Sequence, residues 1–376
     1  MTEQQGTVAV RWGDGTITGV RRSWRGAVEL DVETADGTVC ALAYPRLVGE
    51  PAVGDRVLLN LGALALGLGT GGYAFVVALP DRLPPARPAQ PGHLVKARYT
   101  PLQAVVLGAD EQASPYRADL VDADDLGGMP VVTADLHSAL PAIVAGIHAD
   151  LPEARIAYVM TDGGALPAWF SRTLDAVQDH LAGTITAGQA FGGDLEAVNV
   201  HSGLLAARYA LWADIAIVTQ GPGNLGSGSR WGFSGVAIGE AVNAIGVLGG
   251  RPVGSLRVSS TDPRPRHRGV SHHSLTAYGR VALIAADLVV PDGLDPELAM
   301  VVEAALPELR GDRHRIVRVA TDGLDSVLRA VPLSTMGRGY ADEPGYFLAA
   351  AAAGRHAAAL AGTASGSAGS RPVPAL

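Results

Sequence analysis

The chain has 376 residues, of which 48% are hydrophobic and 18% are charged, and its formal net charge is −8. This length fits two or three domains with cores of their own, and the acidic balance excludes a protein that coats nucleic acid with its whole surface. The single cysteine, Cys40, excludes an internal disulfide and a thiolate metal site. The polar N-terminus lacks the pattern of a signal peptide, and we expect a cytoplasmic protein.

Residues 1–80 predict a small β-barrel of the SH3-like or OB-like kind. Short β-branched segments are separated by turn signals at Asp14-Gly15 and Asp36-Gly37, a pattern of roughly six strands. Residues 57–79 carry no charge and are long enough to span a bilayer. Glycines cluster in the middle of this segment, which favours strand, turn and strand over a membrane helix.

The barrel offers two interpretations of its surface. Tryptophans and arginines near its first strands could stack on bases and contact phosphates, or could simply form a solvated edge. These residues are Trp12, Arg21, Arg22, Trp24 and Arg25. Nucleic acid is therefore a conceivable partner of the barrel, whereas no membrane partner is expected.

A Pro-rich linker over residues 81–92 separates the barrel from a second domain over residues 93–361. Apolar segments without alternation, at residues 102–107, 155–161, 214–219, 253–259 and 315–321, are separated by helical patterns. Such segments predict strands buried on both faces, and hence a mostly parallel, doubly wound, Rossmann-like α/β domain. The Ala-rich segment 342–360 fits either a buried helix or a homo-oligomer interface, and residues 362–376 have the composition of a disordered tail.

Polar segments follow three of the predicted strands. Asp162 follows residues 155–161, a Gly-rich segment over residues 220–235 follows the next strand, and residues 260–274 follow the strand after it. Ligands bind outside the carboxyl ends of parallel strands. We therefore expect the ligand site of the domain to lie in these segments.

The Gly-rich segment suits a small anionic ligand, phosphorylated or carboxylated. Glycine lets backbone N–H groups approach an anion, and an arginine can clamp it, although tight loop packing would also explain the glycines. The candidate anion-binding residues are Gly221, Gly223, Gly226, Gly228 and Arg230, together with Arg264, Arg266 and Arg268 of the following segment.

Histidines and carboxylates supply the candidate reactive groups. We expect Asp162, His201, His272 and His273 to act as general acids or bases. With Asp262, the same residues are also the ligand types of a divalent metal, although no helical metal-binding spacing is present.

Several long phrases of the sequence resemble a bacterial protein family of unknown function. They are "HLVKARYTPLQ" (93–103), "DEQASPY" (110–116), "VMTDGGALP" (159–167), "GPGNLGSGSRWGFSG" (221–235) and "DPRPRHRGVSHHS" (262–274). The resemblance covers nearly everything but the tail. It implies a bacterial cytoplasmic protein and supports a domain boundary near His93, but it assigns no activity, cofactor or catalytic residue.

Two hypotheses remain open from the sequence. The first is an α/β enzyme that acts on a small anionic substrate, with or without a divalent metal. The second is a non-catalytic protein whose α/β domain senses a metabolite and whose barrel binds RNA or a protein partner.

Overall fold

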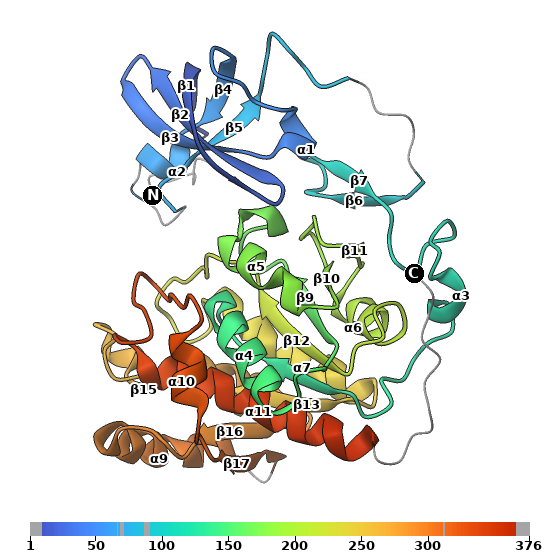
Figure 1. The fold of residues 1–376 in the computed structure, drawn as a ribbon, viewed down its shortest axis with the longest axis vertical. Coiled ribbons are helices and arrows are strands. Elements are labelled where there is room, and N and C mark those ends of the chain that lie inside the picture. The colour runs from blue at the N-terminus through green and yellow to red at the C-terminus, as the bar shows by residue number, and fades with distance from the viewer. Residues whose placement is uncertain (1–9, 66, 68–70, 86–90, 311–312, 366–376) are drawn as a thin grey trace, which may run out of the picture. The chain divides into compact units, whose positions relative to one another are not determined.

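A computed structural model describes residues 10–365, except residues 66, 68–70, 86–90 and 311–312 (Figure 1). The chain divides into two compact units, Met1–Gln90 with Ala97–Ala104 and Pro91–Lys96 with Val105–Leu376. The second unit begins at Pro91, which is close to the domain boundary predicted near His93. The described part of the predicted linker, residues 81–85 and 91–92, forms neither helix nor strand; its other residues lie outside the described ones.

The first unit contains the predicted small barrel, which is closed and five-stranded in the order β1-β2-β3-β5-β4. Its core is formed by alternate residues of the strands, among them Ile17, Leu30, Val32 and Leu59. Its elements are β1 (Trp12–Trp24), β2 (Ala27–Thr34), β3 (Gly37–Ala43), α1 (Pro45–Val48), β4 (Arg56–Asn60), α2 (Gly62–Ala65) and β5 (Ala74–Ala78).

The first predicted hairpin is wrong, because β1 runs straight through Asp14-Gly15 as one strand. Gly15 pairs with Thr34, and a Cβ at Gly15 would press on the carbonyl oxygen of Glu33. The glycine thus permits a close approach of two strands rather than a turn. The second hairpin is confirmed, since Gly37, with φ +112°, begins β3 and pairs with Thr34 at the end of β2.

Acidic side chains engage two of the arginines on the barrel surface. Arg21 Nε donates to Asp31 Oδ1 over 2.8 Å, and Arg22 Nε lies 3.5 Å from Glu29 Oε2. Residues 57–79 form β4, α2 and β5 in their described part. Across the described residues, no helix is both long and apolar enough to cross a membrane.

The second unit is built on an eight-stranded sheet in which every neighbouring pair is parallel, with the order β11-β10-β9-β12-β8-β13-β16-β17. This is the predicted doubly wound, Rossmann-like α/β architecture. The strands are β8 (Pro130–Thr133), β9 (Ile156–Thr161), β10 (Gly183–Thr186), β11 (Leu195–Glu196), β12 (Ile215–Gln220), β13 (Arg251–Ser255), β16 (Asp287–Pro291) and β17 (Arg315–Val319).

Helices cover both faces of the sheet. Each face of the sheet has its own hydrophobic core, and successive residues of a strand point into different cores. In β8, Val132 belongs to the core on one face and Val131 to the core on the other. The first face carries α4 (Leu140–Asp150), α5 (Arg172–Val177), α10 (Leu324–Arg329) and α11 (Pro344–Ser365). The second carries α6 (Val200–Tyr209), α7 (Ala237–Val247) and α9 (Pro296–Arg310). α4 and α11 run side by side (Figure 1).

A central strand was missed from the sequence, and another segment was assigned to the wrong place. The predicted buried strand at residues 102–107 is β7 (Ala104–Val106), which forms a separate two-stranded sheet with β6 (Leu94–Lys96) and leaves Val105 exposed. The sheet is instead centred near β8, whose four residues are all buried.

The C-terminal helix extends further than its sequence pattern suggested. α11 continues to Ser365, four residues into the segment predicted to be a disordered tail. The extension, Gly-Thr-Ala-Ser, has low helix propensity apart from its alanine; it continues the preceding helix, and Thr363 Oγ1 donates to the carbonyl oxygen of Leu360 over 2.8 Å. The rest of the predicted tail, residues 366–376, lies outside the described residues.

We predict that Gly354→Ala destabilises the protein through the contact between α11 and α4. A Cβ at Gly354 would overlap the carbonyl oxygen of Ile143, and such overpacking costs about 1–3 kcal/mol. Gly362→Ala on the same helix is the matched control, because nothing lies within 4 Å of its added Cβ. Urea unfolding should show the loss for Gly354→Ala alone; equal midpoints for the two variants would contradict the packing described.

Candidate functional site

A pocket lies at the carboxyl ends of three adjacent strands, β12, β8 and β13. It has a volume of about 390 Å³ and is lined by residues 136–138 after β8, by the Gly-rich segment after β12, and by residues that follow β13. The chain leaves β8 for α4 on one face of the sheet, and leaves β12 for α7 on the other. Loops diverge at such a switch point, which is where open α/β sheets bind their ligands.

Three histidines lie together in this pocket. His267, His272 and His273 each place a ring nitrogen within 4.8 Å of the others, and the ring centroids of His272 and His273 are 4.5 Å apart. His272 and His273 open the short helix α8 (His272–Thr276), whose N-cap residue Ser271 accepts a hydrogen bond from the N–H of His273 over 3.2 Å. The helix start thus lets two adjacent side chains reach one site.

His273 is fixed by a carboxylate and an aromatic ring. Its Nδ1 lies 3.1 Å from Oδ2 of Asp135, and its ring stacks on Phe233 with a centroid distance of 3.9 Å. Burial acts to raise the pKa of Asp135, but the hydrogen bond with His273 and the charge of Arg257 lower it overall. An ionised carboxylate only accepts hydrogen bonds, so the contact with Asp135 favours the tautomer of His273 with the proton on Nδ1. The same Nδ1 lies 3.3 Å from Nδ2 of Asn224 and 3.4 Å from Nη1 of Arg257.

The other two histidines are also held in defined surroundings. His267 Nδ1 lies 2.7 Å from Oγ of Ser271, while Nε2 of His272 is buried and has no hydrogen-bond partner in the described part of the chain. Burial and the charge of Arg257 lower the pKa of His267 to about 3, and burial with neighbouring His273 lowers that of His272 to about 4. Both rings are therefore neutral at pH 7.

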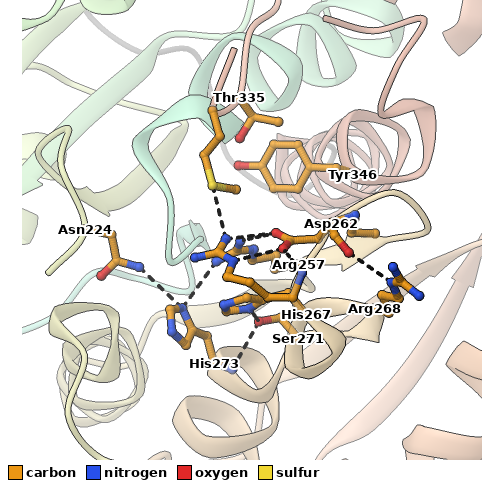
Figure 2. A network of polar contacts seen from close by, with 12 residues as sticks. Asn224, Arg257, Asp262, His267, Arg268, Ser271, His273, Thr335 and Tyr346 are labelled. Carbon is orange, nitrogen blue, oxygen red and sulfur yellow. Dashed lines mark hydrogen bonds and ion pairs between the residues drawn. The ribbon is translucent and has the colours of Figure 1, made fainter. Parts of the chain in front are cut away.

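A buried carboxylate organises the arginines beside the histidines (Figure 2). Asp262 is fully buried and accepts two hydrogen bonds of 2.9 Å from Arg264 and one of 3.2 Å from Arg257. Arg268 donates to the carbonyl oxygen of Asp262 over 3.0 Å. Both carboxylate oxygens of Asp262 and the side chains of Arg264 and Arg268 are thus engaged inside the protein.

The structure gathers some of the sequence-derived candidates and separates others. Gly221, Gly223, Gly226, Gly228, Arg264, Arg266, His272 and His273 line the pocket. Asp162 lies after β9 and accepts a hydrogen bond from the N–H of Gln189 over 2.8 Å. His201, near the start of α6, and Arg230 are exposed. Asp162, His201 and Arg230 are not among the described residues that line the pocket.

Three residues of the site were not chosen from the sequence. Asp135 follows β8, the strand that was missed, although the apolar run "PVVTAD" before a helical pattern was the available signal. His267 stands between two arginines in the sequence and was grouped with that charged segment. Arg257 directly continues an apolar strand pattern, so nothing local marked it as part of the site.

A fourth histidine, His137, lines the pocket but has a different environment. Its Nδ1 lies 2.8 Å from the Tyr158 hydroxyl and its Nε2 lies 2.6 Å from Oγ of Ser171. Ser171 Oγ also accepts the N–H of Leu174 as the N-cap of α5. Because this serine is buried and caps a helix, the Ser171–His137 pair holds α5 against the sheet rather than exposing a nucleophile.

We predict that His137 makes the protein less stable in acid. Burial lowers its pKa to about 4, below the value of about 6.5 for an unfolded chain, so the unfolded state binds more protons between these pH values. The free energy of unfolding should therefore fall as pH decreases from about 6.5 to 4, by about 3 kcal/mol from this residue. Urea unfolding of His137→Gln across this range should show a shallower pH dependence; an unchanged slope would refute this assignment.

We also predict that Asp262→Asn is strongly destabilising. The substitution removes the charge that offsets Arg257 and Arg264, and loss of one partner from a buried ion pair costs about 3–5 kcal/mol. Asp325→Asn, in an exposed pair with Arg329, is the control that should change stability little. Comparable unfolding midpoints for both variants would show that the Asp262 network is not a structural support.

Comparison with known proteins places the chain in a family without assigning an activity. The model of a family described as "Protein of unknown function (DUF3866)" matches residues 40–354. No curated protein gives a significant match. The family match begins within β3 of the barrel, so it leaves out β1 and β2, and it covers nearly all of the α/β domain, including every residue of the pocket described above. The chain therefore belongs to the DUF3866 family of proteins of unknown function.

Proposed function

We propose that the protein is an enzyme that binds a small anionic substrate, phosphorylated or carboxylated, in the pocket at the ends of β12, β8 and β13. The observation that carries this proposal is that the guanidinium of Arg266 is left unpaired by the described residues. It lines the pocket and is exposed, and it forms no ion pair with any described residue. The other two arginines that line the pocket, Arg257 and Arg264, are both bound to Asp262.

The surroundings of Arg266 favour an anion. The neighbouring arginines 257, 264, 268 and 338 outnumber the carboxylates that they contact, Asp135, Asp262 and Glu343. Positive charge is therefore in excess at this site, although the chain as a whole is acidic. An exposed guanidinium beside such an excess attracts a phosphate or carboxylate and can hold it with paired hydrogen bonds.

The Gly-rich segment provides a second side for the ligand. Gly223 and Gly228 have φ +88° and +81°, conformations that favour glycine, and both line the pocket. A Cβ at Gly228 would lie 4.0 Å from Nη2 of Arg266, so the guanidinium lies close to this backbone. Backbone N–H groups in such turns and a nearby guanidinium can bind the same anion.

Histidines supply the chemistry in this proposal. The pKa values of His267 and His272, about 3 and about 4, lie well below the pH at which a general base works best. A neutral imidazole has one ring nitrogen with a free lone pair, and with this nitrogen it can accept a hydrogen bond from a substrate. Their position beside Arg266 puts them within one pocket of the bound anion.

We predict that Arg266→Ala weakens anion binding about 10- to 100-fold, because a hydrogen bond to a charged group contributes about 1.5–3 kcal/mol. The measurement is a thermal-shift and calorimetric titration with inorganic phosphate and a panel of phosphorylated and carboxylated metabolites. Arg230→Ala is the matched control, since Arg230 is exposed and belongs to the neighbouring segment but does not line the pocket.

The control variant should bind each ligand as the unmodified protein does. Equal weakening by both substitutions would show that anion binding depends on the overall positive charge of the protein and not on Arg266 in particular. The absence of binding to every anion tested would overturn the proposed function.

A further inference from the structure

Three of the four histidines that line the pocket lie close enough together to share one ion. One ring nitrogen from each of His267, His272 and His273 lies within 4.8 Å of the other two. The ring centroid of His267 is 4.9 Å from those of both His272 and His273. Convergence of three imidazoles from two separate segments is unusual in a protein interior, where a polar ring nitrogen needs a partner.

An unpartnered atom stands within this group. Nε2 of His272 is buried and forms no hydrogen bond with the described residues. A buried polar atom without a partner costs about 1–3 kcal/mol, and coordination to a metal ion would satisfy it. The atom is the strongest indication that something else completes the site.

The other two histidines have the supporting contacts that metal ligands require. Asp135 lies 3.1 Å from Nδ1 of His273, which leaves Nε2 of that ring for coordination. Ser271 engages Nδ1 of His267 over 2.7 Å. Metal-bound histidines commonly use their second nitrogen in this way, with a carboxylate or another oxygen that fixes the orientation of the ring.

The ligand set indicates which ion fits. Three imidazoles suit zinc and its neighbours in the transition series, whereas magnesium and calcium prefer oxygen ligands. Zinc that acts on a substrate has three protein ligands and one open position. At this site the open position would face the pocket that Arg266 lines.

The charge of Arg257 works against a cation, but two carboxylates offset it. Its Nη1 lies 3.8 Å from Asp135 Oδ2, and its Nη2 lies 3.2 Å from Asp262 Oδ2. Nη1 of Arg257 lies 3.4 Å from Nδ1 of His273, farther than the Asp135 carboxylate at 3.1 Å, so the ring is closer to a negative charge than to this paired guanidinium. A zinc ion binds nitrogen at about 2.0–2.1 Å, so its binding has to draw the three rings slightly together.

We propose that His267, His272 and His273 bind a zinc ion through one ring nitrogen each, oriented by Asp135 and Ser271, with the fourth position open to the pocket. The inference deepens the proposed function and rests on it for the substrate. The open position takes an anionic oxygen of the substrate, or a water molecule whose pKa the ion lowers to about 7. Arg266 binds the part of the substrate's negative charge that does not contact the zinc ion.

The test uses the tag-free, full-length protein after treatment with a chelator. Zinc binding is measured by calorimetry, and cobalt, a spectroscopic substitute for zinc, is titrated to follow its visible absorption. We expect one ion per chain and the intense absorption of a tetrahedral site. His272→Ala should weaken zinc binding at least 100-fold, and it should leave the fold intact because Nε2 of His272 has no partner to lose.

Two further variants make the result specific. Asp135→Asn should weaken zinc binding about 10- to 100-fold, as loss of an orienting partner does. His201→Ala is the matched control, because His201 is exposed and does not line the pocket. Melting curves in the presence of chelator show whether each variant is folded.

The outcomes separate this inference from the proposed function. Arg266→Ala should lose affinity for anions and keep its affinity for zinc. Zinc binding without any anion binding would support the metal site and overturn the proposed substrate. Anion binding by a protein that takes up no zinc, or equal zinc affinity in His272→Ala and His201→Ala, would overturn the three-histidine site.

Discussion

Asp135 is the residue on which the arrangement of the pocket depends. It follows β8, and its carboxylate lies 3.1 Å from Nδ1 of His273, in the segment after β13. Its carbonyl oxygen accepts a hydrogen bond of 2.7 Å from Nε2 of Gln220, the last residue of β12. One residue therefore connects the ends of three adjacent strands, and because its charge is buried, His273 and Arg257 must stay close to it.

The topology of the sheet explains why these contacts occur at this place. β8 lies between β12 and β13, but the helix that follows it packs on the opposite face from α7. The connecting segments separate above β8 and leave a pocket between them. Asp262 then holds Arg257, Arg264 and Arg268 on one side of the pocket, while Phe233 stacks on His273 on another. Arg266, by contrast, is exposed in the pocket and forms no ion pair with any described residue.

The architecture could be predicted from the sequence to the extent that it depends on local patterns. Continuous apolar segments such as residues 155–161 and 214–219 identified strands of the parallel sheet, and β-branched alternation identified the barrel. β8 escaped because it has only four residues and begins with Pro130, whereas residues 102–107 have the composition of a strand but pair outside the main sheet. Neither difference is visible without the long-range pairing that decides which strands are buried.

The site could be predicted in part for the same reason. His272, His273 and the glycines after β12 belong to segments that follow recognised strands, so their convergence was expected. Asp135 was not recognised as a site residue, because β8, the strand that precedes it, had not been predicted. The separate roles of Arg264, Arg266 and Arg268 depend on the position of one buried carboxylate, Asp262, which the sequence does not reveal.

The most direct test of this account is a crystal structure of the full-length protein grown with zinc, with diffraction data collected on both sides of the zinc absorption edge. The account predicts an anomalous peak about 2.0–2.1 Å from one ring nitrogen of each of His267, His272 and His273, with Asp135 still in contact with His273. A map in which zinc binds only elsewhere on the protein, while these rings stay apart, would contradict it.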